Sequence, residues 1–292
     1  MLHFGLRNLL LFFKDKTTLF LSFLAEFIIV GLYLLFIRDN LISGFSQIKD
    51  VELLMDVWMI SGVLGITSVT TTMGAYGIMV DDRAKKISRD FATSPIRKFS
   101  LLGGYMFSAV IIGLVLSFLL LVLSEIYIYF SYGVKLGAEK MLLVYGVLVL
   151  TTVSNSSLVL FLISFLKSSN ALAACCTILG ALIGFLTGIY LPMGNLSGEV
   201  QRLVRCFPVS HGVVMLRQIL LEPLVSRSFG GLQTPPALQF QEYMGIRYPW
   251  DGGFLPLKTS AAVLLGGWII FTLASVWNLS VREKRSRFRL GK

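Results

Sequence analysis

Charged residues are scarce in this chain of 292 residues: they make up 14% of it, against 55% hydrophobic residues. The mean hydropathy is +0.77. A water-soluble domain of this composition would expose large apolar surfaces, so that class is excluded. The apolar runs are continuous and do not alternate with period two, which disfavours a β-barrel. Because a backbone in lipid must satisfy its own hydrogen bonds, the sequence predicts an all-α integral membrane protein.

Cysteine and histidine are also rare, and several catalytic motifs are missing. The three cysteines do not form a disulfide framework, because Cys175 and Cys176 are adjacent within an apolar run and Cys206 has no obvious mate. The chain lacks the phosphate-binding pattern G-x-x-x-x-G-K-[ST], a paired-histidine zinc motif and the nucleophile elbow G-x-S-x-G. We therefore expect a non-catalytic transport protein that binds no metal and no cofactor itself.

Basic residues are in excess, giving a formal net charge of +10, and they gather beside the ends of the apolar runs. Membrane orientation explains this placement, since short loops rich in Lys and Arg stay in the cytoplasm. The basic C-terminal tail from Arg282 to Lys292 fits binding to anionic membrane lipids. The pattern predicts a multi-pass protein of the cell membrane with both termini in the cytoplasm, and it requires no nucleic-acid partner.

Six apolar runs are long enough to cross a bilayer, which takes about 20 residues per helix. They cover residues 18–37, 57–80, 101–130, 141–166, 171–191 and 257–279. Residues 1–16 carry a helical apolar stripe, which predicts an interfacial helix; a ragged start of the first span is the alternative. The extracellular segment 192–256 contains a part, 200–221, that is too apolar for a loop and too charged to span. It predicts re-entrant helices broken at Pro208. Residues 1–292 are treated as a single membrane domain.

Residues 81–98, DDRAKKISRDFATSPIRK, form a basic loop between the second and third spans. Within it, Ala84, Ile87 and Phe91 are spaced by three and four residues, so they share one face of a short helix. Pro95 is expected to end that helix. A short amphipathic helix in a basic loop is expected at the cytoplasmic face, where a soluble partner can bind it.

Two polar side chains stand out inside the spans. Glu26 lies in the first span, where a carboxylate costs about 3 kcal/mol on insertion scales, so we expect it to be protonated, paired or facing water. A functional role and a helix-packing hydrogen bond both stay open for Glu26. Asn155 is the strongest polar candidate in the fourth span, because the hydroxyls around it can bond back to their own helix.

The order of these features resembles that of type-2 ABC exporter permeases, the group that includes drug, antibiotic and polysaccharide export permeases. The resemblance covers nearly the whole chain and rests on the interfacial helix, the six spans and three loose motifs taken together. These motifs are Asp82-Arg83 at the start of the basic loop, Thr93-Ser94-Pro95-Ile96-Arg97 near its end, and Pro208 followed by His211 and Arg217 before the last span.

The resemblance implies that the basic loop is a coupling helix seated in a groove of a separate cytoplasmic ABC ATPase, which binds ATP and Mg²⁺. Ile87 and Phe91 would enter that groove, with polar contacts around them. The implied coupling residues are Asp82, Arg83, Ile87, Arg89, Phe91 and Pro95. The resemblance also implies a second permease subunit, identical or different, and an outer gate formed by the re-entrant helices. The candidate path or gate residues are Glu26, Asn155, Pro208, His211 and Arg217.

The leading interpretation is the permease subunit of an ATP-driven exporter that moves an amphiphilic substrate (drug-like, peptide or lipid) out of the cytoplasm or the inner leaflet. A polysaccharide or teichoic-acid exporter is the alternative within the family. A secondary carrier or channel without an ATPase is the alternative outside it, although few ionisable residues lie in the spans and no inverted repeat is evident. A sensory or immunity membrane protein without transport is a third class.

Overall fold

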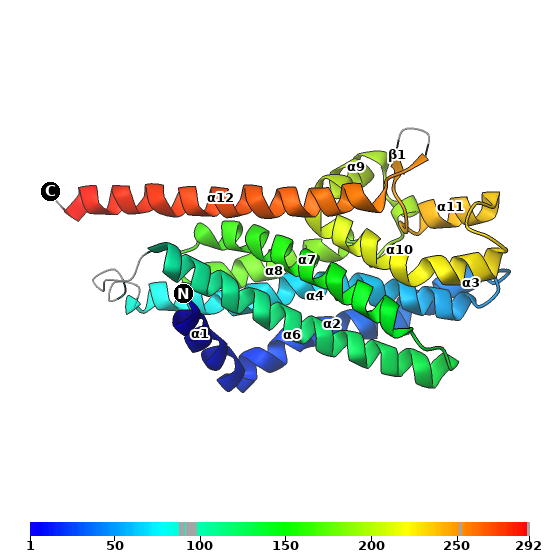
Figure 1. The fold of residues 1–292 in the computed structure, drawn as a ribbon, viewed down its shortest axis with the longest axis horizontal. Coiled ribbons are helices and arrows are strands. Elements are labelled where there is room, and N and C mark those ends of the chain that lie inside the picture. The colour runs from blue at the N-terminus through cyan, green and yellow to red at the C-terminus, as the bar shows by residue number, and fades with distance from the viewer. Residues whose placement is uncertain (88–90, 92–97, 251–252, 291–292) are drawn as a thin grey trace.

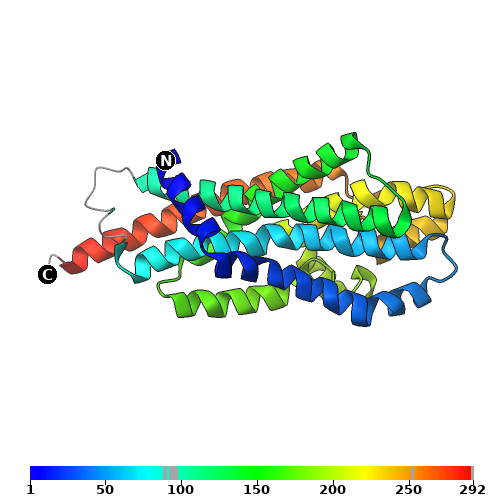
Figure 2. The same ribbon diagram turned by 90° about the horizontal axis from the view of Figure 1, so that it is seen from below.

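The computed structural model describes residues 1–87, 91, 98–250 and 253–290, and the side chains of Lys98 and of residues 282–290 are not described. The predicted coupling residues Arg89 and Pro95 therefore lie outside the described residues. The described chain forms an elongated bundle in which the long helices run roughly parallel to one another (Figures 1 and 2).

The chain is almost entirely helical. The helices before the basic loop are α1 (Leu2–Lys14), α2 (Lys16–Leu32), the π-helical turn η1 (Tyr33–Ile37), α3 (Arg38–Gly44) and α4 (Val51–Ala84). After the loop come α6 (Lys98–Tyr132), α7 (Ala138–Ser164), α8 (Ser169–Leu186), the 3-10 turn η2 (Met193–Asn195), α9 (Gly198–Cys206), α10 (Pro208–Phe229) and α11 (Pro235–Tyr243). A small hairpin of β1 (Pro249–Trp250) and β2 (Gly253–Phe254) precedes α12 (Leu257–Leu290).

Six helical segments among the described residues are long and apolar enough to cross a membrane. They are Lys16–Gly44, Val51–Ala84, Phe99–Tyr132, Ala138–Ser164, Ser169–Leu186 and Leu257–Val281. These segments confirm the predicted all-α integral membrane fold. The first is longer than the predicted 18–37, because η1 and α3 continue α2 without a break.

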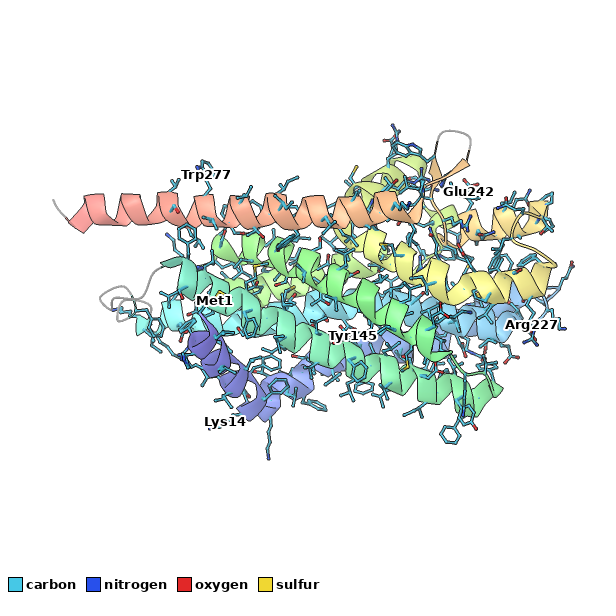
Figure 3. All side chains as sticks on the ribbon, viewed as in Figure 1. Met1, Lys14, Tyr145, Arg227, Glu242 and Trp277 are labelled. Carbon is cyan, nitrogen blue, oxygen red and sulfur yellow. The ribbon has the colours of Figure 1, made fainter. Side chains whose placement is uncertain are left out.

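The bundle has two ends that differ in what they carry. We call the end where α4 finishes at Ala84 and α6 begins at Lys98 the loop end, and the opposite end, with α3 and the end of α10, the far end (Figure 1). Both chain termini lie toward the loop end, and α12 extends there beyond the other helices (Figures 1 and 2). Trp277 projects from this part of α12 away from the bundle (Figure 3).

Helix α1 lies against the start of α6 at an angle to the bundle (Figure 2). Leu2, Leu6, Leu10 and Phe13 of the predicted apolar stripe are exposed in the isolated chain, whereas Phe12 is buried. An exposed apolar face beside a membrane bundle is the arrangement of an interfacial helix. At the end of α1, the Asp15 carboxylate accepts hydrogen bonds from the Thr18 hydroxyl and from the backbone N–H groups of Thr18 and Thr17, and these bonds lower the pKa of Asp15.

Helix α4 is the centre of the bundle. Its apolar window is 94% buried, far more than that of any other candidate span among the described residues, and it packs against α2, α6, α7, α8 and α10. Small residues allow this crowding, since they let helix backbones approach closely. At Gly65, for example, an added Cβ would overlap with the side chain of Val213 on α10.

The segment between the fifth and sixth spans contains the two predicted helices, α9 and α10, which meet at Pro208. Proline suits the first helical position of α10, where its missing N–H costs no hydrogen bond. Helix α10 continues to Phe229 and stops at Gly230, whose φ of 70° is the left-handed conformation that glycine adopts at helix ends. Helix α11 and the β hairpin complete the cap over this part of the bundle (Figure 1).

Candidate functional site

At the loop end, a cluster around Asp82 joins three helices; we call Phe4, Arg7, Asp82, Phe91 and Tyr105 the Asp82 cluster. The Arg7 guanidinium donates two hydrogen bonds to the Asp82 carboxylate, at 2.8 and 3.0 Å. The Tyr105 hydroxyl donates a third, at 2.6 Å. Such charge-assisted, bidentate bonds are the strong ones in proteins. The hydrogen bond to Asp82 also raises the pKa of Arg7, so its positive charge is secure.

Aromatic rings complete the Asp82 cluster and bring the basic loop into it. The Phe91 ring packs edge-on against Phe4, with ring centroids 5.1 Å apart, and Phe4 packs in the same way on Tyr105 at 4.9 Å. The Arg7 guanidinium lies 5.5 Å from the Phe91 ring centroid, within cation–π range. Phe91 of the loop is thereby connected directly to α1 and, through Phe4, to α6.

The neighbouring Arg83 anchors the same end of α4 to another helix. Its guanidinium donates to the backbone carbonyls of Ile163 and Leu166, at 3.3 and 3.2 Å. These carbonyls lie at the C-terminal end of α7, where the helix dipole favours a positive charge. Asp82 and Arg83, two of the predicted coupling residues, therefore bind groups of this chain, and Ile87 is half-buried.

The polar candidates inside the spans lie along the central helix. The Thr70 hydroxyl on α4 donates to Glu26 Oε1 at 2.6 Å. Glu26 is 2% exposed, and its second carboxylate oxygen has no hydrogen-bond partner among the described residues. On the other side of α4, the Asn155 amide donates to the Ser68 hydroxyl at 2.7 Å, while its carbonyl oxygen is unpartnered within the same described set. Both candidates thus keep one polar atom available for a further partner.

Arg217 on α10 is a buried cation, 1% exposed, that has no carboxylate within ion-pairing distance among the described residues. Its guanidinium donates to the carbonyls of Gly188, Met244 and Gly245 at 3.2 to 3.4 Å and lies 4.6 Å from the Trp58 ring centroid. These carbonyls follow the C-terminal ends of α8 and α11, so two helix dipoles and an aromatic face replace the missing anion. Arg217 therefore joins α10 to α4, α8 and the cap.

His211 has both ring nitrogens engaged, and Pro208 lies at the start of the same helix. His211 Nε2 is 2.9 Å from the Arg205 carbonyl, which can only accept, so Nε2 carries the proton and donates. Nδ1 then accepts from the Ser260 hydroxyl on α12, at 3.1 Å. The neutral tautomer satisfies both contacts, which makes His211 a connection between α9, α10 and α12.

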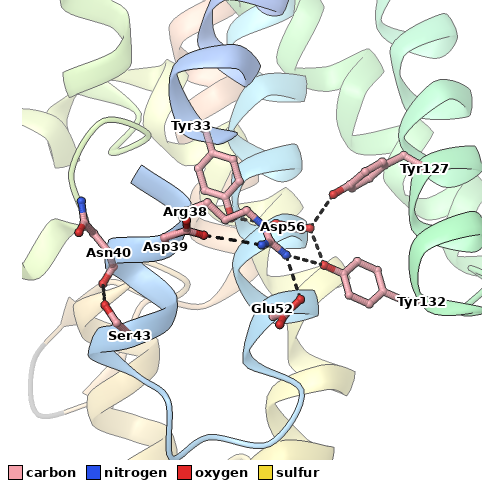
Figure 4. Close-up of polar contacts among 9 residues, drawn as sticks. All are labelled: Tyr33, Arg38, Asp39, Asn40, Ser43, Glu52, Asp56, Tyr127 and Tyr132. Carbon is pink, nitrogen blue, oxygen red and sulfur yellow. Dashed lines mark hydrogen bonds and ion pairs between the residues drawn. The ribbon is translucent and has the colours of Figure 1, made fainter. Parts of the chain in front are cut away.

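At the far end, a second buried carboxylate gathers four donors (Figure 4). Asp56 on α4 is fully buried and accepts hydrogen bonds from the hydroxyls of three tyrosines at 2.6 to 3.0 Å and from Arg38 Nε at 3.0 Å. The tyrosines are Tyr33, Tyr127 and Tyr132. Arg38 also donates to Glu52, at 3.1 Å. We call these residues the Asp56 cluster, and they tie η1, α3 and α6 to the start of α4.

A scan against protein-family models matches residues 3–221, from α1 into α10, to the family described as ABC-2 type transporter. The chain belongs to this family. It is a multi-pass membrane permease of an ABC-2 type transporter, a kind of subunit that is generally non-catalytic. Membership also implies pairing with an ABC ATPase subunit in general. No curated protein matches the chain.

The two carboxylate clusters of the permease were not anticipated from the sequence. The sequence pattern does not predict a role for Arg7, Asp56 or Tyr105, because charged residues and tyrosines are common at the membrane interface, near the ends of apolar runs. The sequence does contain one indication of the clusters. Asp56 and Asp82 flank the two ends of the same glycine- and threonine-rich apolar run, each within one helical turn of it. Acids at that depth require partners.

Proposed function

We propose that this permease is the membrane subunit of an exporter that moves an amphiphilic substrate out of the cytoplasm or the inner leaflet, driven by a separate cytoplasmic ABC ATPase. The observation that carries the proposal is the Asp82 cluster, in which loop residue Phe91 packs on Phe4 and Arg7 of the interfacial helix α1, and Phe4 in turn packs on Tyr105 of the spanning helix α6. A partner that pushes on the loop would therefore act on α1 directly and on α6 through Phe4.

The proposed orientation places the loop end in the cytoplasm, at the cell membrane. Residues 81–98 contain six basic and three acidic residues. Short basic loops are retained in the cytoplasm, and both termini lie toward the same end of the bundle (Figure 1). The far end, with the re-entrant helices and the cap, then faces outward and serves as the gate.

In the proposed coupling mechanism, the apolar face around Ile87 and Phe91 binds a groove of the ATPase and the charges set its register. ATP and Mg²⁺ are bound by the ATPase. Asp82 and Arg83 hold the base of the loop within the chain, so that motion of the loop is passed to α1, α6 and α7. A direct contact of Asp82, Arg83, Arg89 or Pro95 with the ATPase remains part of the proposal.

The side chains in the interior of the bundle support the proposal that the substrate is amphiphilic. The polar side chains of the interior are mostly hydroxyls on α4 and α7, and Glu26 and Asn155 are, with several of these hydroxyls, groups that keep an unpartnered oxygen among the described residues. Hydroxyls and apolar walls suit a molecule with a small polar part and a large apolar part. A second permease subunit, identical or different, would complete the path.

The decisive experiment combines affinity purification in mild detergent with a matched pair of variants. We expect an ABC ATPase to copurify with the wild-type permease and with Phe99→Asp, because Phe99 is exposed at the same end and lies outside the Asp82 cluster. Phe91→Asp should still insert but should lose the ATPase and ATP-dependent export. Export at the normal rate in Phe91→Asp would contradict the coupling assignment.

A further inference from the structure

A pocket of about 350 Å³ opens at the far end between α4, α6, α7 and α10. Its walls come from the first turns of α4, the last turns of α6, the turn into α7 and the second half of α10. The apolar part is formed by Leu53, Val57, Leu121, Ile128 and Leu220, all of them buried. Apolar walls with a few polar groups are typical of sites for small molecules and lipids.

One wall of the pocket contains a backbone carbonyl that has lost its helical partner. Pro223 lies inside α10 and has no N–H, so the carbonyl of Ile219, four residues earlier, cannot form its usual helical hydrogen bond. Both Ile219 and Pro223 line the pocket. A carbonyl freed in this way in apolar surroundings favours a ligand that brings an N–H donor.

The rim of the pocket carries two charges of each sign, from Glu125, Lys135, Glu139 and Lys140. Glu125 Oε1 accepts a hydrogen bond from the Leu136 N–H at 2.5 Å, which holds the carboxylate at the rim and leaves its other oxygen for a ligand. Lys135 lies over the Tyr129 ring, at 4.5 Å from its centroid. Lys140 has no ion-pair partner among the residues whose structure is described. A balanced rim of this kind complements a headgroup that carries both charges.

We propose that this pocket binds a zwitterionic phospholipid whose headgroup carries a primary ammonium group. The ammonium donates to Glu125 and to the Ile219 carbonyl, the phosphate lies toward Lys140 and Lys135, and an acyl chain fills the apolar part. The site lies where α4 and α7 begin and α6 ends, and the ends of spans are the level at which a protein meets lipid headgroups. Its assignment to the outer leaflet rests on the orientation given under the proposed function, whereas the choice of ligand rests on the pocket alone.

The test uses the full-length permease in nanodiscs of phosphatidylcholine that contain a trace of phosphatidylethanolamine with a photoactivatable group on one acyl chain. We expect crosslinks to peptides around residues 219–224 and 121–128. The same probe built on phosphatidylglycerol, which lacks the ammonium, should label these peptides about tenfold less, the loss expected for one charge-assisted hydrogen bond.

Two variants that keep the fold test the headgroup contacts. Glu125→Gln keeps an acceptor for the Leu136 N–H but removes the charge, and Pro223→Ala restores a helical partner to the Ile219 carbonyl. Each should reduce labelling by phosphatidylethanolamine several-fold, whereas Glu199→Gln, an exposed acid of α9 that does not line the pocket, should not. Equal labelling by the two lipids, or unchanged labelling in both variants, would overturn the proposal. Crosslinking requires no ATPase, so the two proposals can fail independently. Lipid labelling can be observed when export is not, and export can be observed when lipid labelling is not.

Discussion

The Arg7–Asp82 ion pair offers the sharpest test of how the loop end is held together. The Asp82 side chain is 5% exposed and that of Arg7 is 33% exposed, so the burial of this ion pair is intermediate between that of a buried pair and that of a surface pair. Hydrogen bonds to charged groups contribute about 1.5–3 kcal/mol, and exposed pairs about 0.2–1 kcal/mol. We therefore expect a coupling energy of about 1–2 kcal/mol for this pair, reduced from the buried limit by the solvent that reaches Arg7.

The measurement is a double-mutant cycle with Arg7→Met, Asp82→Asn and the double variant, followed by reversible unfolding in mixed detergent micelles. Methionine loses the cation–π contacts of Arg7 with Phe4 and Phe91, but it loses them in the single and the double variant alike, so they cancel in the cycle. Asparagine keeps an acceptor for Tyr105, so the coupling energy reports the charge pair. A distance measured between spin labels on α1 and α6 should lengthen in Asp82→Asn if the pair holds α1 in place.

The control for this cycle is the Arg202–Glu199 pair on α9, where both side chains are more than two-thirds exposed. An exposed helical pair of this spacing should give a coupling energy of no more than about 0.5 kcal/mol. An Arg7–Asp82 value as small as that of the control, together with an unchanged spin-label distance, would refute the view that this pair connects α1 to α4.

Three further changes test the other buried polar groups. Asp56→Asn should lower the free energy of unfolding in detergent by about 2–4 kcal/mol, because Arg38 loses its buried counterion. Asp39→Asn, at an exposed position, should change the free energy of unfolding little, and equal effects of the two variants would show that Asp56 does not stabilise the fold through this network. Arg217→Ala should cost about 3 kcal/mol in the same assay, since it leaves a cavity and three buried carbonyls without their donor; a cost below about 1 kcal/mol would argue against the carbonyl cage. Glu26→Gln keeps an acceptor for Thr70, so protein yield should hold while substrate stimulation of ATP hydrolysis changes; a change in yield alone would make Glu26 a packing residue.

The spans and the central position of α4 could be predicted because each depends on local composition. A run of about 20 apolar residues must be helical in lipid, and frequent Gly and Thr indicate close packing. The break between α9 and α10 was equally readable, because Pro208 cannot continue a helix that precedes it. These features follow from neighbouring residues and need no knowledge of distant contacts.

The polar clusters could not be predicted because their members lie far apart in the sequence. Arg7 and Asp82 are separated by 75 residues, and Tyr132 and Asp56 by 76. The charges of Arg38 and Asp39 look like the end of the first span, yet the helix continues to Gly44 because Arg38 turns toward Asp56 instead of solvent. The tyrosines of α6 resemble an aromatic belt at the membrane interface, which conceals that their hydroxyls point inward to a carboxylate.

The placement of the two carboxylates on one helix suggests how the permease would combine rigidity with motion. Asp82 fixes the loop end of α4 to α1 and α6, and Asp56 fixes its far end to α3 and α6. Helix α6 contributes Tyr105 to the Asp82 cluster and two tyrosines to the Asp56 cluster, so α4 and α6 are joined at each end and should move as one unit. Helix α8 contacts α4 without such a buried ion pair among the described residues, and its apolar window is only 11% buried. A force applied at the loop would then shift the α4–α6 pair relative to α8, because the weakest connections of a packed bundle yield first.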